Sequence, residues 1–595
     1  MSSLAVRFLA GHNLIERLEQ TRAERGAAVA AARLALLKRL EGAVVADPAE
    51  LLRFHDTLLF LRAYPDDAGV LRAVERALQE FSRRVAGATS GEGGAAGAAA
   101  LRDSGLAGTR NIYTYSWAMV RLLVRQHPGD LEIAWEEWDD SSGFYALLSA
   151  VSVYGETPGI DDERTDGAAW LDRARAGRKL TDLELLLEIL ETSPHAPEAR
   201  EALYDSLKMP VEWRLRGAGA TRATGAVTVT TGATTSSYFR PRRTHFHPEA
   251  WSRAAPELAT HAATPLPSVE RLSPRDAEAA IALVTAAMSV RNREIYPLAH
   301  PETRDVTRVT LDRGLEILVY GIAPRRRLLI ETAHGHLVLK NGVPVGYAVS
   351  SVLGSACEVA LNVYETFRQG ESALWVAELL RVFHQLFGPE FFFVPRRQFG
   401  FDNEESIATG AYWFYDKLGF RSIDPGLRRL ADREREKIRA TRGYRSSAVT
   451  LRRLATEDLG FALRAGFDAT SIVPVASISL AVTDWIARRY SGDRARAQAA
   501  AERLVVRWFG LEADGASGGG SRGISPEVQL WLTRWAPLIA LIPDRVKWSR
   551  DERAALLSIV RAKAASSESV AIGKMRRHRR WMLYLKGAAQ KPNAF

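Results

Sequence analysis

The first third of the chain has the apolar periodicity of helices. Asp47 followed by Pro48 predicts an N-cap and the start of a helix over 49–62. Asp67 predicts the cap of a second helix that runs to residue 84. Residues 86–100 are almost wholly Gly, Ala and Ser, which predicts a flexible linker or surface loop. Four more helices are expected over 115–126, 168–176, 182–191 and 197–207, with a short strand near 131–135.

The middle of the chain changes to alternating β-type patterns. A helix is expected from Ser273-Pro274 through 287, followed by strands over 315–320, 336–340, 345–352 and 358–363. Asn341-Gly342 predicts a two-residue hairpin turn, because a type I′ turn needs positive φ at both positions. A helix over 371–387, a strand over 391–394 and a helix ending at Leu418-Gly419 follow.

The remaining pattern is helical again, so we expect an α+β multidomain protein with helical regions on both sides of a central mixed sheet. The low-complexity stretch 217–237 indicates a boundary. The expected organisation is a helical domain over 1–216, with a further division near 86–100 left open, a linker over 217–269, an α/β domain over 270–425 and a helical domain over 426–595.

Composition adds little to this picture. The 595 residues include one cysteine, Cys357, which excludes a disulfide within the chain and favours a reducing, cytoplasmic compartment. The apolar runs are too short to span a bilayer, so no membrane association is expected. The net charge of +10 permits nucleic-acid binding without indicating it.

Two motifs give the central region a family resemblance. Residues 356–363 form an expected strand, and Arg368-Gln369-Gly370-Glu371-Ser372-Ala373 opens the following helix. Residues 410–420, Gly-Ala-Tyr-Trp-Phe-Tyr-Asp-Lys-Leu-Gly-Phe, give a helix, a glycine stop and the start of a last strand. Together with the order of elements, these motifs resemble the GNAT superfamily of acyl-CoA N-acyltransferases, over about a quarter of the chain.

The resemblance implies a sheet that splays between its fourth and fifth strands to admit acetyl-CoA or another acyl-CoA. The loop would hold the CoA pyrophosphate on backbone N–H groups and a helix dipole. The loop fits the family pattern with a one-residue deletion and Ser372 in place of a glycine, and Glu371 opposes phosphate unless its carboxylate turns away. The residues expected to bind the co-substrate are Val359, Ala360, Leu361, Arg368, Gln369, Gly370, Ser372 and Ala373.

The same resemblance implies two catalytic residues. Tyr415 corresponds to a tyrosine that protonates the departing CoA thiolate, with a core aromatic as the alternative interpretation. Glu358 stands where some members keep a glutamate base, with an outward-facing strand residue as the alternative. The asparagine that the family usually keeps six residues before Phe414 is Ala408 here, and Asn403 lies further upstream.

The expected function is acetyl or acyl transfer to an amine on a small molecule or a protein that the sequence does not identify. The alternative is a GNAT-like fold without catalysis that serves as a binding or scaffold module. A third possibility is nucleic-acid association through the basic run 576–580, with Trp581 stacking on a base. His245, His247 and His261 are weak metal-ligand candidates, and we expect no metal.

Overall fold

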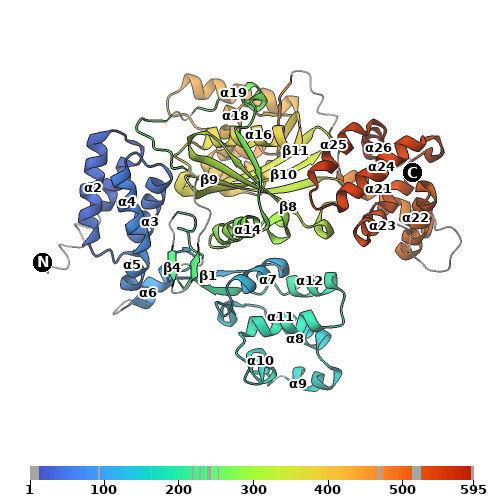
Figure 1. Ribbon diagram of the computed structural model, residues 1–595, viewed down its shortest axis with the longest axis horizontal. Helices are drawn as coiled ribbons and strands as arrows, with labels where there is room; N and C mark the ends of the chain where they lie inside the picture. Colours follow the sequence, from blue (N-terminus) through green and yellow to red (C-terminus); the bar gives the residue numbers. More distant parts are fainter. Residues whose placement is uncertain are drawn as a thin grey trace.

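A computed structural model describes residues 13–90, 94–162, 164–216, 220–226, 229–231, 234–236, 243–251, 254–464, 472–473, 475–511 and 524–590. Within these residues the protein is α+β, and a large mixed open sheet forms its centre. The helices of residues 27–100 and the C-terminal helices of residues 475–590 lie at opposite ends of the molecule, on either side of the sheet, and the helices of residues 117–206 lie below the sheet in the view of Figure 1.

The central sheet has nine strands in the order β13-β14-β12-β11-β10-β9-β8-β7-β6. Their bounds are β6 Ser268–Arg271, β7 Pro301–Thr310, β8 Leu315–Ile322, β9 Thr332–Lys340, β10 Val343–Leu353, β11 Ala356–Val363, β12 Phe391–Val394, β13 Arg421–Ser422 and β14 Leu459–Ala462. The five strands expected between 315 and 394 are confirmed. The alternation did not identify β6, β7 or β14, and β14 comes from a stretch expected to be helical.

Neighbouring strands of the sheet are antiparallel except for the pair β11 and β12. The turn between β9 and β10 is the expected one, because Asn341 has φ 50° and Gly342 has φ 81°. The parallel pair is joined by a crossover through α16 (Ser372–Phe387), as a parallel connection requires. β14 lies between β12 and β13, so residues beyond 425 complete the sheet.

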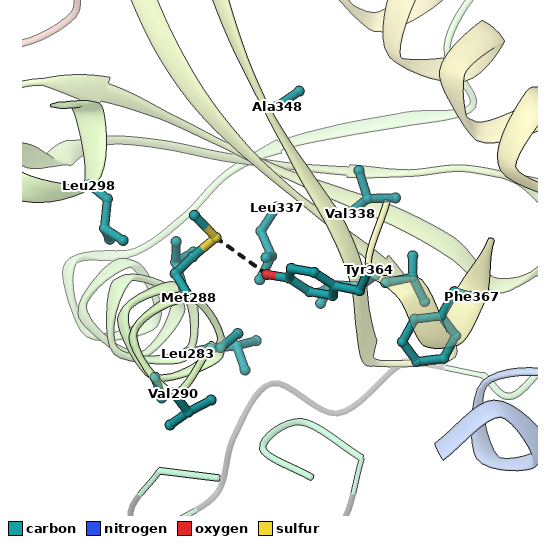
Figure 2. Close-up of a cluster of buried hydrophobic side chains, with 14 of the residues drawn as sticks. Leu283, Met288, Val290, Leu298, Leu337, Val338, Ala348, Tyr364 and Phe367 are labelled. Carbon is teal, nitrogen blue, oxygen red and sulfur yellow. Dashed lines mark hydrogen bonds between the residues drawn. The ribbon is translucent and has the colours of Figure 1, made fainter. Parts of the chain in front are cut away.

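Helices cover both faces of the sheet. α16 packs with α13 (Leu258–Ala263) on one face, where a Cβ on Gly346 would meet Trp375 and where the Phe383 ring lies 4.5 Å from His336. On the other face, α14 (Pro274–Ser289) buries an apolar side, and Tyr364 Oη donates a hydrogen bond to Met288 Sδ at 3.3 Å (Figure 2). The predicted Ser273 cap of α14 is confirmed, because its side chain accepts the N–H of Asp276.

The N-terminal region consists of two groups of elements. The first group is α2 Ala27–Glu41, α3 Pro48–Ala63, α4 Ala68–Gln79, α5 Phe81–Ala88 and α6 Gly94–Ala100. The Asp47 and Asp67 caps are confirmed. The linker expected over 86–100 is wrong for residues 86–88, which end α5, and for residues 94–100, where alanine's high propensity favours a helix. Buried Arg62 of α3 donates to the carbonyl of Asn341 at 3.0 Å and so joins this group to the central hairpin.

The second N-terminal group surrounds a three-stranded sheet with the order β1-β3-β2. Its elements are β1 Arg110–Tyr113, α7 Trp117–Gln126, β2 Leu131–Ile133, α8 Ser142–Val151, α9 Thr157–Ile160, α10 Gly167–Arg175, α11 Asp182–Thr192, α12 Pro197–Ser206 and β3 Val211–Arg214. The four predicted helices and the short strand are confirmed. β1 and β3 were not expected.

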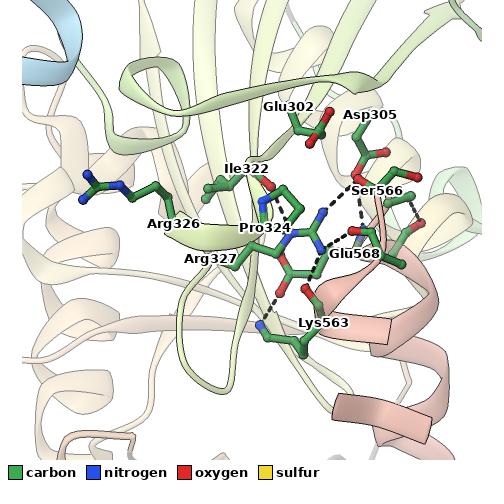
Figure 3. Close-up of polar contacts among 12 residues, drawn as sticks. Glu302, Asp305, Ile322, Pro324, Arg326, Arg327, Lys563, Ser566 and Glu568 are labelled. Atoms are coloured by element: carbon green, nitrogen blue, oxygen red, sulfur yellow. Dashed lines mark hydrogen bonds and ion pairs between the residues drawn. The ribbon is translucent and has the colours of Figure 1, made fainter. Parts of the chain in front are cut away.

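The C-terminal helices have an apolar core of their own, built around Trp531, Trp535 and Trp581. They are α21 Val475–Tyr490, α22 Arg494–Phe509, α23 Pro526–Ala540, α24 Arg550–Ala564, α25 Ser569–Arg577 and α26 Arg579–Gln590. A fully buried polar cluster joins this body to the sheet. In it Arg327, from the β8–β9 connection, donates to the carbonyl of Lys563 at 2.6 Å, and Lys563 pairs with Glu568 (Figure 3).

No helix in the described ranges combines the length and the apolar character needed to cross a membrane.

Candidate functional site

A pocket of about 400 Å³ opens where β11 and β12 diverge. The two strands pair only from Ala356 opposite Phe391 to Glu358 opposite Phe393, so the second half of β11 has no β12 partner in the described sheet. The carboxyl ends of parallel strands meet at one edge of a sheet, which is where ligands commonly bind in α/β folds. The pocket is lined by Ile295, Tyr347, Val349, Ala360, Leu361, Asn362, Val363, Arg368, Ser372, Gln398, Asn403, Glu405, Ser406, Thr409, Gly410, Ala411, Phe414 and Tyr415.

The free edge of β11 presents a backbone donor to this pocket. The N–H of Leu361 donates to Gln398 Oε1 at 3.1 Å, in place of a ladder bond to a neighbouring strand. Gln398 ends a short 3-10 helix, Arg396–Gln398, which follows β12. A side-chain amide is a mobile acceptor that an incoming carbonyl oxygen can replace, because both accept the same N–H. Sequence reasoning named Leu361 and missed Gln398, whose position depends on the fold beyond β12.

Tyr415 lies on α18 (Ala411–Lys417) and reaches the same pocket. Its side chain is 3% exposed and packs edge-on against the rings of Phe399 and Phe420, with centroids 6.2 and 6.0 Å away. Burial raises the pKa of the Tyr415 phenol, so the hydroxyl stays protonated and able to donate. The predicted stop of this helix is confirmed, since Gly419 has φ 100°. Tyr415 is therefore both a packed aromatic and a pocket residue.

The expected phosphate loop contributes two of its residues to the pocket, Arg368 and Ser372. The Arg368 guanidinium forms an ion pair with Glu405 at 2.9 Å. Gln369 instead borders a separate cavity beside the N-terminal helices, together with Glu19 and Arg53. The other three predicted binding residues, Val359, Gly370 and Ala373, are not among the residues that line the main pocket.

The carboxylate of Glu371 is turned into the protein. It is 4% exposed and contacts Lys340 Nζ at 2.6 Å and Arg313 Nη2 at 2.6 Å. Burial lowers the pKa of Lys340 to about 8, while the adjacent Glu371 opposes that shift. Because this carboxylate is paired and is not part of the pocket lining, it does not oppose an anion there.

Tyr64, the residue that follows α3, contacts the chain at the start of α16. Its Oη accepts a hydrogen bond from the N–H of Glu371 at 3.3 Å, and a Cβ on Gly370 would lie 2.5 Å from that oxygen. Position 370 therefore requires glycine, because the Tyr64 ring lies too close to the backbone there for a side chain to fit. The sequence gives no signal for this contact, because the two residues lie more than 300 positions apart.

Glu358 lies just beyond the pocket, on the strand face that also carries Ala360. Burial, and then the charges of Glu331 and Asp458, raises the pKa of the Glu358 carboxyl to about 6. Alternating side chains share a face, so the pocket residue Ala360 is its immediate neighbour on that face. The structure thus places the expected base beside the pocket and outside its lining.

Asn403 caps α17 (Glu404–Thr409) by accepting the N–H of Ser406, and it also lines the pocket. Buried His247 packs against Tyr64 and Trp251. In the part of the chain that the structure describes, no group of three or more His, Cys, Asp or Glu side chains is arranged to hold a metal ion. Trp581, considered as a stacking residue for a base, is fully buried and stacks on Trp535, so that interpretation is wrong.

Comparison of the chain with protein-family models, curated proteins and solved structures gives no match.

Proposed function

We propose that the protein is an acyl-CoA-dependent N-acyltransferase that transfers an acyl group, most simply acetyl, to an amine. The observation that carries the proposal is the pocket at the diverging β11–β12 pair, which brings the Leu361 N–H, at the free edge of β11, together with Tyr415. A diverging parallel pair supports the proposal, because the GNAT resemblance implies one. Arg368 and Ser372, the first residue of α16, line the same pocket, where the guanidinium and the helix dipole can interact with the CoA phosphates.

The reaction follows from these groups. The neutral amine attacks the thioester carbonyl, whose oxygen accepts the Leu361 N–H as negative charge develops on it. The new C–N bond forms, the C–S bond breaks and the CoA thiolate leaves. Tyr415 gives its proton to the thiolate, because a charge leaving into an apolar slot must be neutralised. The attacking nitrogen loses one proton, which Glu358 accepts directly or through water.

A calorimetric titration with acetyl-CoA and with desulfo-CoA tests the proposal. Both ligands carry the adenosine, phosphate and pantetheine parts, so both are expected to release or absorb heat and to raise the melting temperature by mass action. Absence of heat and of a thermal shift at millimolar ligand would refute the proposal.

A non-catalytic binding module of the same architecture is the second candidate. Two contacts favour it: Arg368 is already paired with Glu405, and the Glu371 N–H is already bonded to Tyr64. This candidate predicts that acyl-CoA binds without turnover. Slow hydrolysis of bound acetyl-CoA that depends on Tyr415 would exclude it.

A further inference from the structure

One face of the β10–β11 hairpin, opposite the face that packs on α16, forms a strip of accessible side chains. Four cross-strand pairs project from it: Tyr347 with Asn362, Val349 with Ala360, Ser351 with Glu358, and Leu353 with Ala356. Seven of these eight side chains are half-buried, and only Ala356 is buried. By contrast, Gly346 and the other residues of β10 that project towards α16 are buried. The strip is a partly open sheet surface.

A cavity lies at each end of the strip. The main pocket includes the first two pairs, Tyr347 with Asn362 and Val349 with Ala360. A second cavity of about 320 Å³ includes the last pair, Leu353 with Ala356, and the hairpin turn between them. Along the strip, the pair of Ser351 and Glu358 lies between the two cavities, and the Ser351 hydroxyl donates to Glu331 Oε1 at 3.4 Å. Ala360 and Ala356 are four residues apart on an extended strand, which is roughly 13 Å at about 3.3 Å per residue.

The second cavity is basic. Arg576, Arg579 and Lys586 line it, and the described residues of its lining include no acidic side chain. None of these three cations forms an ion pair within the described residues, although Arg576 donates to the carbonyl of Gly388 at 2.6 Å. Elsewhere on this surface, arginines such as Arg580 are paired with carboxylates. Three cations that have no carboxylate partner among the described residues favour an anionic group in this cavity, which they can hold by charge-assisted hydrogen bonds.

We propose that the acyl acceptor is an extended acidic peptide that lies along this strip. Its N-terminal amine would reach the main pocket beside Ala360, and an acidic side chain about four residues further on would bind Arg576, Arg579 and Lys586. Glu358 lies between the two cavities, so its carboxylate would repel a peptide carboxylate placed nearer to the amine. The proposal rests on the proposed acyl transfer and specifies its acceptor.

Binding of labelled peptides to the full chain tests this register. Four peptide amides of equal length are compared: one with aspartate at its fifth residue, one with asparagine there, and two with the aspartate moved to the third or the seventh residue. The first peptide is expected to bind at least about tenfold more tightly than the other three, a ratio that corresponds to roughly 1.4 kcal/mol and is typical of one charge-assisted contact. Equal affinity of the first two peptides would overturn the proposal.

The variant Arg579→Gln/Lys586→Gln should lose the preference for aspartate over asparagine and keep its affinity for the asparagine peptide. Arg577→Gln is the matched control, since Arg577 is exposed on α25 and does not line the cavity. A double variant that retains the preference for aspartate would contradict the proposal. The acetyl-CoA titration uses no peptide, so failure of the acceptor proposal and failure of the acyltransferase proposal are separate results.

Discussion

The backbone N–H of Leu361 donates to the side-chain oxygen of Gln398 at 3.1 Å, across the gap where β11 and β12 part. In the proposed reaction, the thioester carbonyl oxygen takes the place of the Gln398 side-chain oxygen on the Leu361 N–H. Gln398→Ala removes the competitor, so acetyl-CoA should bind up to about fivefold more tightly, since a neutral hydrogen bond contributes roughly 1 kcal/mol. Free CoA lacks the acyl carbonyl and should bind as before. Calorimetry that shows equal changes for both ligands would contradict this role of Leu361.

Tyr415→Phe should reduce kcat by about 10²–10⁴, the range typical of a lost general acid, with little change in acetyl-CoA affinity. The ring packing against Phe399 and Phe420 is retained, so the melting temperature should be nearly unchanged. Tyr412→Phe is the control, because Tyr412 is buried on the same helix and does not line the pocket. Equal turnover of the two variants would remove Tyr415 from the mechanism.

Glu358 should produce a rising limb in the pH profile of kcat/KM near pH 6. Its carboxyl pKa is raised from 4.5 to about 6, and only the ionised form accepts a proton, so the rate increases as pH rises through that value. Glu358→Gln should lower the rate and abolish the limb. A limb that persists in this variant belongs to another group and would remove Glu358 from the proton transfer.

The pH dependence of protein stability gives an independent measurement of the Glu358 carboxyl pKa. A raised carboxyl pKa means that the folded state binds more protons than the unfolded state between about pH 4.5 and 6. The contribution of Glu358 to the free energy of unfolding is therefore present below that window and is lost as pH rises through it. Urea titrations of Glu358→Gln should lack this loss. Identical pH dependence in both proteins would show that Glu358 is not perturbed.

Arg327 should be essential for attaching the C-terminal helices to the sheet. Its side chain is fully buried and donates to the carbonyls of Ile322, Lys563 and Ser566, beside the Glu568 carboxylate (Figure 3). Arg327→Leu leaves these acceptors with fewer partners in a dry interface and should cost about 3–5 kcal/mol. Thermal unfolding and limited proteolysis measure the effect, and exposed Arg325→Leu is the control. Similar melting temperatures for the two variants would contradict the prediction.

The sequence predicted elements well wherever local chemistry determines them. The Asp47, Asp67 and Ser273 caps and the Asn341-Gly342 turn lie where expected, because capping and turn geometry depend on a few adjacent residues. β14 was missed because its four residues, Leu459–Ala462, become a strand only by pairing with β12 and β13. Short strands carry too little alternation to be identified without their partners.

In the candidate site, too, the residues found in local motifs were predicted and those that depend on distant contacts were not. Ala360, Leu361, Arg368, Ser372 and Tyr415 were named from motifs and meet in one pocket. Gln398, Tyr64 and Lys340 were not foreseen, because each acts through a contact between distant parts of the chain. The sequence also did not determine whether Glu371 opposes phosphate binding, since ion pairs with Lys340 and Arg313 orient its carboxylate.

A structure of the protein crystallised with acetyl-CoA at millimolar concentration would locate the bound thioester. Acyl transfer at this pocket requires the thioester to lie between β11 and β12, with its carbonyl oxygen on the Leu361 N–H, its sulfur within hydrogen-bond reach of Tyr415 Oη and its pyrophosphate beside Arg368 and Ser372. An empty pocket, or acetyl-CoA bound at another place on the molecule, would contradict it.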